Sequence, residues 1–100
     1  MKKTAIELIA EERQRQIDIE GWTPDHDATH TNGELARAAA CYCMTELVEK
    51  NYKPQFTFAA IMTVWPFSKE WFKPTPDNRI RELVKAGALI AAEIDRIKNK

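Results

Sequence analysis

The sequence has no excess of charge of either sign. Fifteen lysine and arginine residues balance fifteen aspartate and glutamate residues in a chain of 100 residues. A neutral chain has no long-range electrostatic attraction to a nucleic-acid backbone or to an anionic membrane surface. Nucleic acid is therefore an unfavoured partner.

Long hydrophobic runs are also missing. No stretch approaches the ~20 consecutive apolar residues that cross a bilayer. The basic residues Lys2 and Lys3 precede polar and charged residues rather than the apolar segment of a signal peptide. We therefore expect no membrane partner and a location in the cytoplasm.

Cysteine is scarce. Cys41 and Cys43 lie two positions apart in an alanine-rich run with helical character. On a helix such residues point in different directions, so we expect no disulfide between them. We interpret both as small buried thiols.

The residues that are present suit a folded domain. Hydrophobic residues make up 44% of the chain and charged residues 30%, which is too much apolar material for a disordered tail. The length fits one domain with one core. We therefore expect one site per chain.

Residue chemistry marks the first helix at both ends, and we predict it over residues 5–20. Thr4 and Glu7 have the spacing of a capping box, and Gly21 can supply a left-handed stop. A loop over residues 21–32 follows, with room for one short turn after Pro24.

A second capping box, Thr31 with Glu34, predicts a helix that continues to about Lys50. This helix is apolar nearly all round, so we expect it at the centre of the fold. Asn51 and Pro54 would end it.

Residues 55–64 are ambiguous. Phe56 and Phe58 alternate as in a strand, whereas residues 58–62 suit a short buried helix, which we favour. An aromatic loop follows, in which prolines forbid helix continuation. Its large side chains could cover the core, stack on a base or enter a partner's groove: Trp65, Phe67, Trp71 and Phe72.

Thr75 as cap and Pro76 at the first helical position predict a last helix that extends to about Ile97. About 100° per residue places its apolar residues on one stripe, which we expect to face the core: Ile80, Leu83, Val84, Gly87, Ile90, Ala91, Ile94 and Ile97. The segments together predict a single all-α domain over residues 1–100, a bundle of three to four helices with an aromatic WP loop that dimerises.

The first helix carries polar residues on the face expected to be buried. The same construction places four apolar residues on one side, yet Arg13 and Glu20 fall within their stripe, Gln16 at its edge and Glu12 one step further out. The apolar four are Ile6, Ile9, Ala10 and Ile17. A desolvated charge costs several kcal/mol unless it is paired.

Two interpretations of this face stay open. Arg13 could pair with Glu20, or with an acid of another helix, at a helix–helix or dimer seam. Alternatively the face lines a polar cavity whose carboxylates hold a divalent cation, because Mg²⁺ prefers oxygen ligands.

His26 and His30 lie four residues apart, which would place both imidazoles on one side of a helix. A zinc site needs a third and a fourth ligand, and the surrounding residues indicate an irregular loop. Hydrogen bonds to the loop backbone are therefore the favoured role. The capping box likewise explains Glu34, although its side chain could face the first helix.

Several segments resemble a family of small phage and prophage proteins, and the match spans most of the chain apart from residues 44–64. The N-terminal half is similar to phage dATP/dGTP pyrophosphohydrolases of the all-α MazG-like group. The segments are ERQRQ (12–16), EGWTP (20–24), HD (26–27), His30, GELARAA (33–39), WP (65–66), WFKP (71–74) and LVKAGALIAAEIDR (83–96).

The resemblance implies a helical oligomer that uses Mg²⁺, held by helix carboxylates, to let water cleave a nucleoside triphosphate to the monophosphate and pyrophosphate. The group carries a Glu-Glu-x-x-Glu helix and a later Glu-x-x-Asp helix. Neither motif is intact here, since Glu34 is followed three residues later by Arg37.

We therefore expect a phage-encoded, nucleotide-handling protein of the host cytoplasm. The alternative is a non-catalytic accessory protein that binds and inhibits a host protein. Arg13 would face phosphate, and the metal ligands would come from Glu12, Glu20 and Glu34. The expected ligand-binding residues are Arg13, Gln16, Glu20, Trp22, His26 and Asp27.

Overall fold

The computed structural model describes residues 2–50 and 57–99, and all regular structure in these ranges is helical. The all-α fold is therefore confirmed. The elements are α1 (Ala5–Asp18), α2 (Pro24–Asp27), α3 (Glu34–Glu49), α4 (Phe58–Met62), a 3-10 turn η1 (Lys69–Trp71) and α5 (Arg79–Lys98).

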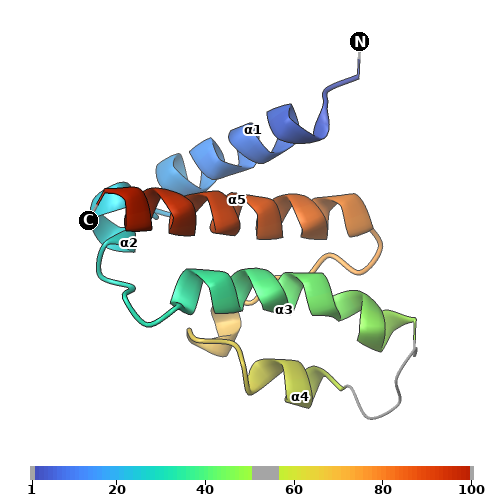
Figure 1. Ribbon diagram of the computed structural model, residues 1–100. Coiled ribbons are helices and arrows are strands. Elements are labelled where there is room, and N and C mark those ends of the chain that lie inside the picture. The colour runs from blue at the N-terminus through green and yellow to red at the C-terminus, as the bar shows by residue number, and fades with distance from the viewer. Residues whose placement is uncertain (1, 51–56, 100) are drawn as a thin grey trace.

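The long helices form a slab with α5 in the middle. Helix α5 lies between α1 and α3, and α4 packs against the other side of α3 (Figure 1). The body measures 40 × 39 × 22 Å. The prediction that α3 is the central helix is therefore wrong: its small apolar residues do not require neighbours on every side, and Ala36 and Ala40 are exposed.

Local chemistry sets the ends of α1 as predicted. The Thr4 hydroxyl accepts from the Glu7 amide at 3.2 Å, and the Glu7 carboxylate accepts from the Thr4 amide at 2.9 Å. Gly21 adopts a φ of 74°, which confirms the left-handed position after the helix. The helix itself ends at Asp18, two residues before the predicted end.

The predicted start of α3 is wrong. Gly33, with a φ of 77°, is the residue that precedes the helix, and no Thr31–Glu34 capping box forms. The Glu34 carboxylate instead accepts from the Asn32 amide at 2.6 Å. A glycine turns the chain here because residues with a side chain rarely adopt a positive φ. Asn51 and Pro54, which were to end this helix, lie outside the described residues.

The predicted start of α5 is wrong as well. Asn78 caps the helix by accepting from the Arg81 amide at 3.1 Å. Thr75 and Pro76 belong to a preceding turn, closed by a bond of 2.8 Å from the Asn78 amide to the Thr75 carbonyl. An asparagine nearer to the helix competes successfully for the capping position.

The core lies between α3, α4, the aromatic loop and one side of α5. The short helix at residues 58–62 is confirmed, whereas Phe56 is not described. Of the two thiols, Cys41 is buried but Cys43 is exposed, and neither forms a disulfide. The largest core side chains are Leu35, Tyr42, Ile61, Trp65 and Leu89, with Phe67 and Phe72 packed against them.

The stripe predicted to place α5 against the core instead faces mainly outward. Ile80, Ile94 and Ile97 are each more than half exposed, whereas Leu89 and Ala92 are buried. Helix axes approach more closely where the side chains between them are small. The alanines of α5 therefore make its helix contacts, and the isoleucines lie on the far side.

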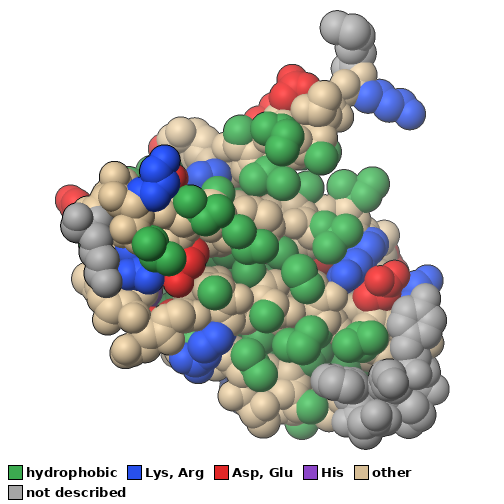
Figure 2. Space-filling view, in the orientation of Figure 1, with side chains coloured by type: hydrophobic (Ala, Val, Ile, Leu, Met, Phe, Trp, Pro, Cys, Tyr) green, Lys and Arg blue, Asp and Glu red, His purple; other side chains and the backbone are tan. Residues whose placement is uncertain are grey.

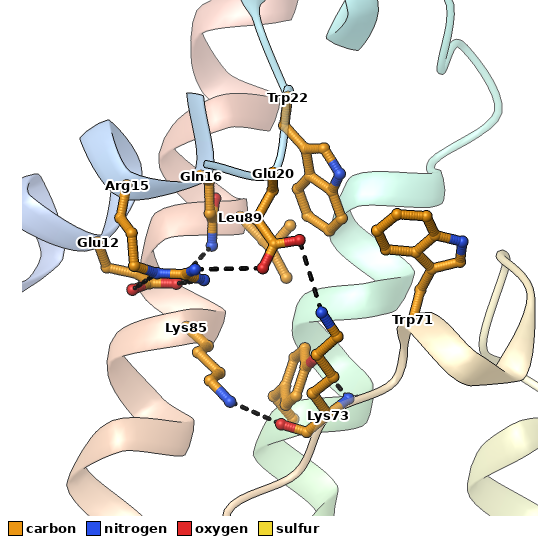
Figure 3. Close-up of a pocket in the computed structure, with 10 residues that line it drawn as sticks. Glu12, Arg15, Gln16, Glu20, Trp22, Trp71, Lys73, Lys85 and Leu89 are labelled. Carbon is orange, nitrogen blue, oxygen red and sulfur yellow. Dashed lines mark hydrogen bonds and ion pairs between the residues drawn. The ribbon is translucent and has the colours of Figure 1, made fainter. Parts of the chain in front are cut away.

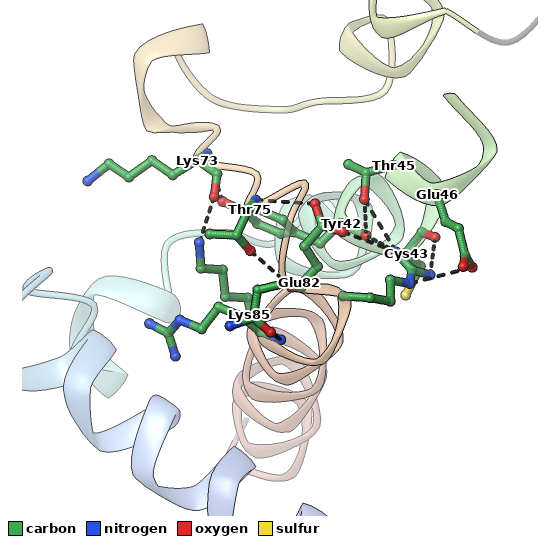
Figure 4. Close-up of polar contacts among 11 residues, drawn as sticks. Tyr42, Cys43, Thr45, Glu46, Lys73, Thr75, Glu82 and Lys85 are labelled. Carbon is green, nitrogen blue, oxygen red and sulfur yellow. Dashed lines mark hydrogen bonds and ion pairs between the residues drawn. The ribbon is translucent and has the colours of Figure 1, made fainter. Parts of the chain in front are cut away.

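A buried polar network joins the start of α5 to α3 (Figure 4). Arg79 donates to the carbonyl groups of Tyr42 at 3.2 Å and Cys43 at 2.8 Å. Its guanidinium also lies 3.5 Å from Glu82, whose side chain is fully buried. The charge of Glu82 is thus paired, as a buried carboxylate requires.

Among the described residues, no helix has the length and apolar composition that crossing a membrane requires.

Gly87 offers a test of how closely α1 approaches α5. A Cβ at this position would lie 2.7 Å from Cδ1 of Ile9. Replacing a glycine within a helix by alanine normally stabilises by about 1 kcal/mol. We expect Gly87→Ala to lack this gain in the wild-type chain and to show it in an Ile9→Ala background. Urea unfolding of the four proteins measures the difference, and equal effects of Gly87→Ala in both backgrounds would contradict the close approach.

Candidate functional site

The inward face of α1 is polar. Glu12 and Gln16 are 2% and 3% exposed and are the buried residues of the helix, whereas Ile6 is 75% exposed. The expected stripe of isoleucines therefore does not face the core. Gln16 is buried as predicted, and Arg13 and Glu20 are half-buried rather than open to bulk solvent.

Glu12 is held by two arginines. Nε and Nη2 of Arg15 each donate to one Glu12 oxygen at 2.9 Å, and Nη1 of Arg81 lies 2.6 Å from Oε1. Burial raises the pKa of Glu12, but the hydrogen bonds from Arg15 and Arg81 outweigh it and hold the pKa below its ordinary value. Glu12 therefore stays ionised at neutral pH.

Glu20 continues the network towards the aromatic loop (Figure 3). Arg15 Nη1 donates to Glu20 at 3.2 Å, and Lys73 Nζ lies 3.7 Å from its other oxygen. Lys85 donates to the Lys73 carbonyl at 2.6 Å. Burial lowers the pKa of Lys85, and the charge of Arg81 lowers it further.

These residues line a pocket between α1, α3, α5 and the segment that follows η1. Trp22 and Trp71 contribute indole rings, and Arg15, Lys73 and Lys85 contribute cations. Three cations against the two carboxylates of Glu12 and Glu20 give the lining a formal charge of +1. The complete lining is Glu12, Arg15, Gln16, Glu20, Trp22, Tyr42, Trp71, Lys73, Lys85 and Leu89.

This pocket has a volume of about 30 Å³, and a second pocket of about 320 Å³ adjoins it. The two share Glu20, Trp22 and Trp71, so we treat them as one cleft, named here the tryptophan cleft. Trp71 is 45% exposed and lies on its rim. The other residues of the second pocket are Gly21, His26, Asp27, His30, Leu35, Phe67 and Ser68.

Arg13 fixes the loop that carries Trp22. Its guanidinium donates to the Trp22 carbonyl at 3.0 Å and to Asp27 Oδ2 at 2.6 Å. Burial raises the pKa of Asp27, and the attraction of Arg13 only partly offsets it. Arg13 was expected to face phosphate, but its hydrogen bonds give it the role of holding this loop.

Two buried oxygens of the tryptophan cleft have no hydrogen-bond partner in the described part of the chain. They are Oε1 of Gln16 and Oδ1 of Asp27. Buried acceptors in proteins almost always receive a hydrogen bond from the protein, from water or from a ligand. Donor groups of a ligand or of water would satisfy both atoms.

His26 and His30 do lie on one side of their turn. Their Nε2 atoms are 3.3 Å apart, and the Glu34 carboxylate lies 3.7 Å from Nδ1 of His30. The expected bonds to the loop backbone are thus replaced by a contact between the two rings.

The carboxylates predicted to bind a metal are only partly brought together. Glu12 and Glu20 both bond to Arg15, whereas Glu34 contacts His30 and the Asn32 amide. In residues 2–50 and 57–99 no three histidine, cysteine, aspartate or glutamate side chains form a metal-binding group. The three predicted glutamates therefore do not form one cage in this arrangement.

The sequence interpretation did not single out the cations of the tryptophan cleft. Lys85 was taken as one of the charged residues opposite the core, because the stripe of isoleucines was assigned to the core face of α5. The spacing of Glu82, Lys85 and Leu89 could have indicated that Lys85 is buried. It places two ionisable groups on the same side of α5 as a buried leucine.

No family model, no curated protein and no solved structure matches this chain.

Glu12 gives the site a pH-dependent stability. Because its pKa is lowered by folding, its ion pairs stabilise fully above the ordinary value of 4.5, and the stabilisation is lost as the pH falls through the lower folded-state pKa. We expect Glu12→Gln to reduce the free energy of unfolding at pH 7 by about 1–3 kcal/mol. The difference from wild type should shrink at pH 3.

Urea unfolding at the two pH values measures this effect. Glu11→Gln is the matched control, because Glu11 is exposed and pairs with Lys3 at the surface, where a change of at most about 0.5 kcal/mol is expected. A Glu12→Gln cost that is the same at both pH values would refute the assignment.

Proposed function

We propose that this protein binds a nucleotide in the tryptophan cleft. The base would lie against Trp22 and Trp71, and the phosphates would lie towards Arg15, Lys73 and Lys85. The observation that carries the proposal is that two indole rings and three cations line one cleft. A nucleotide has two complementary parts, because its base can stack on the indole rings and its phosphates carry the opposite charge to the cations.

The aromatic part of the cleft suits a base. Trp71 is 45% exposed. The ring centroids of Trp22 and Phe67 lie 5.9 Å apart, and this packing holds the Trp22 ring in place. Stacking of a base on an aromatic side chain contributes about 1–3 kcal/mol, whatever the base.

The polar part suits phosphate. Lys73 and Lys85 are joined through the Lys73 carbonyl, and Arg15 is held by both neighbouring carboxylates. Phosphate oxygens accept charge-assisted hydrogen bonds from lysine and arginine. Burial and the charge of Arg81 lower the pKa of Lys85, and a bound anion would compensate the like charges of these two residues.

The resemblance to MazG-like pyrophosphohydrolases narrows the class to purine deoxynucleoside triphosphates, and it supports hydrolysis with Mg²⁺ as a stronger form of the proposal. Glu12 and Glu20 are the candidate magnesium ligands beside the cations. Both carboxylates bond to Arg15, so a metal ion would compete with this guanidinium. We therefore propose binding as the function and treat cleavage as a separate question.

The test is calorimetric titration of the purified protein with each deoxynucleoside triphosphate, with and without Mg²⁺. We expect Trp71→Ala to weaken binding by about fivefold or more, since loss of one stacking contact removes at least about 1 kcal/mol. Trp71→Phe should retain most of the affinity. Lys73→Ala should weaken binding of the triphosphate more than binding of the nucleoside.

Lys69→Ala is the matched control for Lys73, because Lys69 is an exposed lysine of the same loop that does not line the cleft. Absence of binding heat with all four triphosphates would reject the proposal. Release of pyrophosphate that requires Mg²⁺ and is lost in Glu20→Gln would extend it to hydrolysis.

The exposed indole of Trp71 favours a second candidate, a phage accessory protein that binds and inhibits a host protein. Large exposed aromatic residues are typical anchors of protein interfaces, and Lys73 Nζ lies 5.5 Å from the Trp71 ring. We then expect a host protein that is retained from lysate by wild type and not by Trp71→Ala. Equal retention by both proteins would count against this candidate.

A further inference from the structure

Two histidines in the segment between α1 and α3 present the same ring atom to each other. Nε2 of His26 and Nε2 of His30 lie 3.3 Å apart, and the two rings are nearly perpendicular at 82°. They are the two histidines of the chain. The proposed nucleotide contacts give this pair no role, so its arrangement needs an explanation of its own.

Local hydrogen bonds fix the turn that carries both rings. The Thr23 hydroxyl accepts from the His26 amide at 3.2 Å, and the Thr29 hydroxyl donates to the His26 carbonyl at 2.7 Å. The His30 amide donates to the Asp27 carbonyl at 3.0 Å. The backbone therefore holds the two side chains on one side of the turn.

The distance between the two nitrogens is that of two imidazole ligands on one metal ion. Zinc binds histidine nitrogen at about 2.0–2.1 Å in tetrahedral geometry, which places two ligating nitrogens about 3.3–3.4 Å apart. The Nε2 atoms of His26 and His30, at 3.3 Å, already have this spacing.

The surroundings of His30 prepare its Nε2 atom for such a role. The Glu34 carboxylate lies 3.7 Å from Nδ1, the other nitrogen of the ring. A carboxylate on this side favours a proton on Nδ1, which leaves the lone pair of Nε2 free, and it is the usual partner of a metal-bound histidine. The ring of Phe67 packs against His30 with centroids 5.1 Å apart, so the orientation of the imidazole is also fixed.

We propose that His26 and His30 bind one Zn²⁺ ion through their Nε2 atoms, with Glu34 as a positioning residue that orients His30. Imidazole nitrogen suits zinc, whereas magnesium prefers oxygen ligands. The site therefore differs in its ligands and in its ion from the magnesium site that the glutamates would form. Zinc binding at this pair needs no nucleotide, so the proposal does not rest on the proposed function.

The histidine pair supplies two of the four ligands that zinc takes. Within residues 2–50 and 57–99 no group of three histidine, cysteine, aspartate or glutamate side chains completes the set. Both histidines line the second pocket of the tryptophan cleft, so water or an oxygen of a ligand in the cleft fills the remaining positions. Structural zinc has four protein ligands, whereas zinc that binds a ligand keeps an open position. The ion is therefore exchangeable.

Nitrogen-15 NMR of the histidine rings tests the proposal on the wild-type chain. Addition of ZnCl₂ alone, without nucleotide, should shift the Nε2 signals of both rings together and saturate at one ion per chain. With two histidines in the chain, each ring can be followed by itself. A shift of one ring only, or no shift at millimolar zinc, would overturn the proposal and leave a hydrogen bond between two neutral rings.

Calorimetric titration with Zn²⁺ separates a chelating pair from two independent imidazoles. His26→Ala and His30→Ala should each lower the affinity by more than about tenfold, since loss of either ligand ends chelation. Glu34→Gln should lower the affinity by about tenfold or more and keep one ion per chain. Two ions bound to wild type and one to each histidine variant would overturn the proposal, and unchanged affinity in Glu34→Gln would refute the role of Glu34.

Cys43→Ser is the matched control, because this exposed thiol is of a type that also binds zinc. It should leave zinc binding unchanged, and loss of binding in this variant would place the ion at the thiol instead. If a histidine variant fails to fold, the NMR titration of wild type decides alone. Zinc binding by a chain that binds no nucleotide would support this proposal and reject the proposed function, so the two failures are separate results.

Discussion

The buried carboxylate of Glu12 is the constraint on which the arrangement of α1 depends. An ion removed from water costs several kcal/mol unless groups of opposite charge surround it. Arg15 and Arg81 supply this charge at 2.9 and 2.6 Å. Because Glu12 is buried in α1 and pairs with Arg81, α1 is joined to α5 by an ion pair as well as by the packing of Ile9 on Gly87.

The same ion pairs create the cleft. Arg15 binds Glu12 and Glu20 together, and Glu20 in turn approaches Lys73. A cluster of this kind holds Arg15 in a fixed orientation, so an anion that enters loses little free energy in ordering it. Stability and the proposed binding therefore rest on the same side chains, and a change at Glu12 should affect both.

Local sequence chemistry was enough to predict the helices but not the faces that they bury. Thr4 and Gly21 act within a few residues of the helix end that they define, so their roles could be read directly. Periodicity states which residues share a side of a helix, but it does not state which side meets the core. On α5 the isoleucines and the alanines form opposite sides, and the larger residues were wrongly assigned to the interior. Lys85 was missed for the same reason.

Helices α1 and α5 deviate from the usual pattern in the same direction. Ile6 and Ile94 lie outside, whereas Glu12 and Lys85 lie inside, although burial of charge costs energy and burial of isoleucine stabilises. The interior charges are stable because Glu12 meets Arg81 across the α1–α5 contact and Lys85 donates to the carbonyl of Lys73. The exterior isoleucines find no such partner within the described chain. The two helices therefore each have two unlike sides, a polar one that faces the cleft and an apolar one that faces outward (Figure 2).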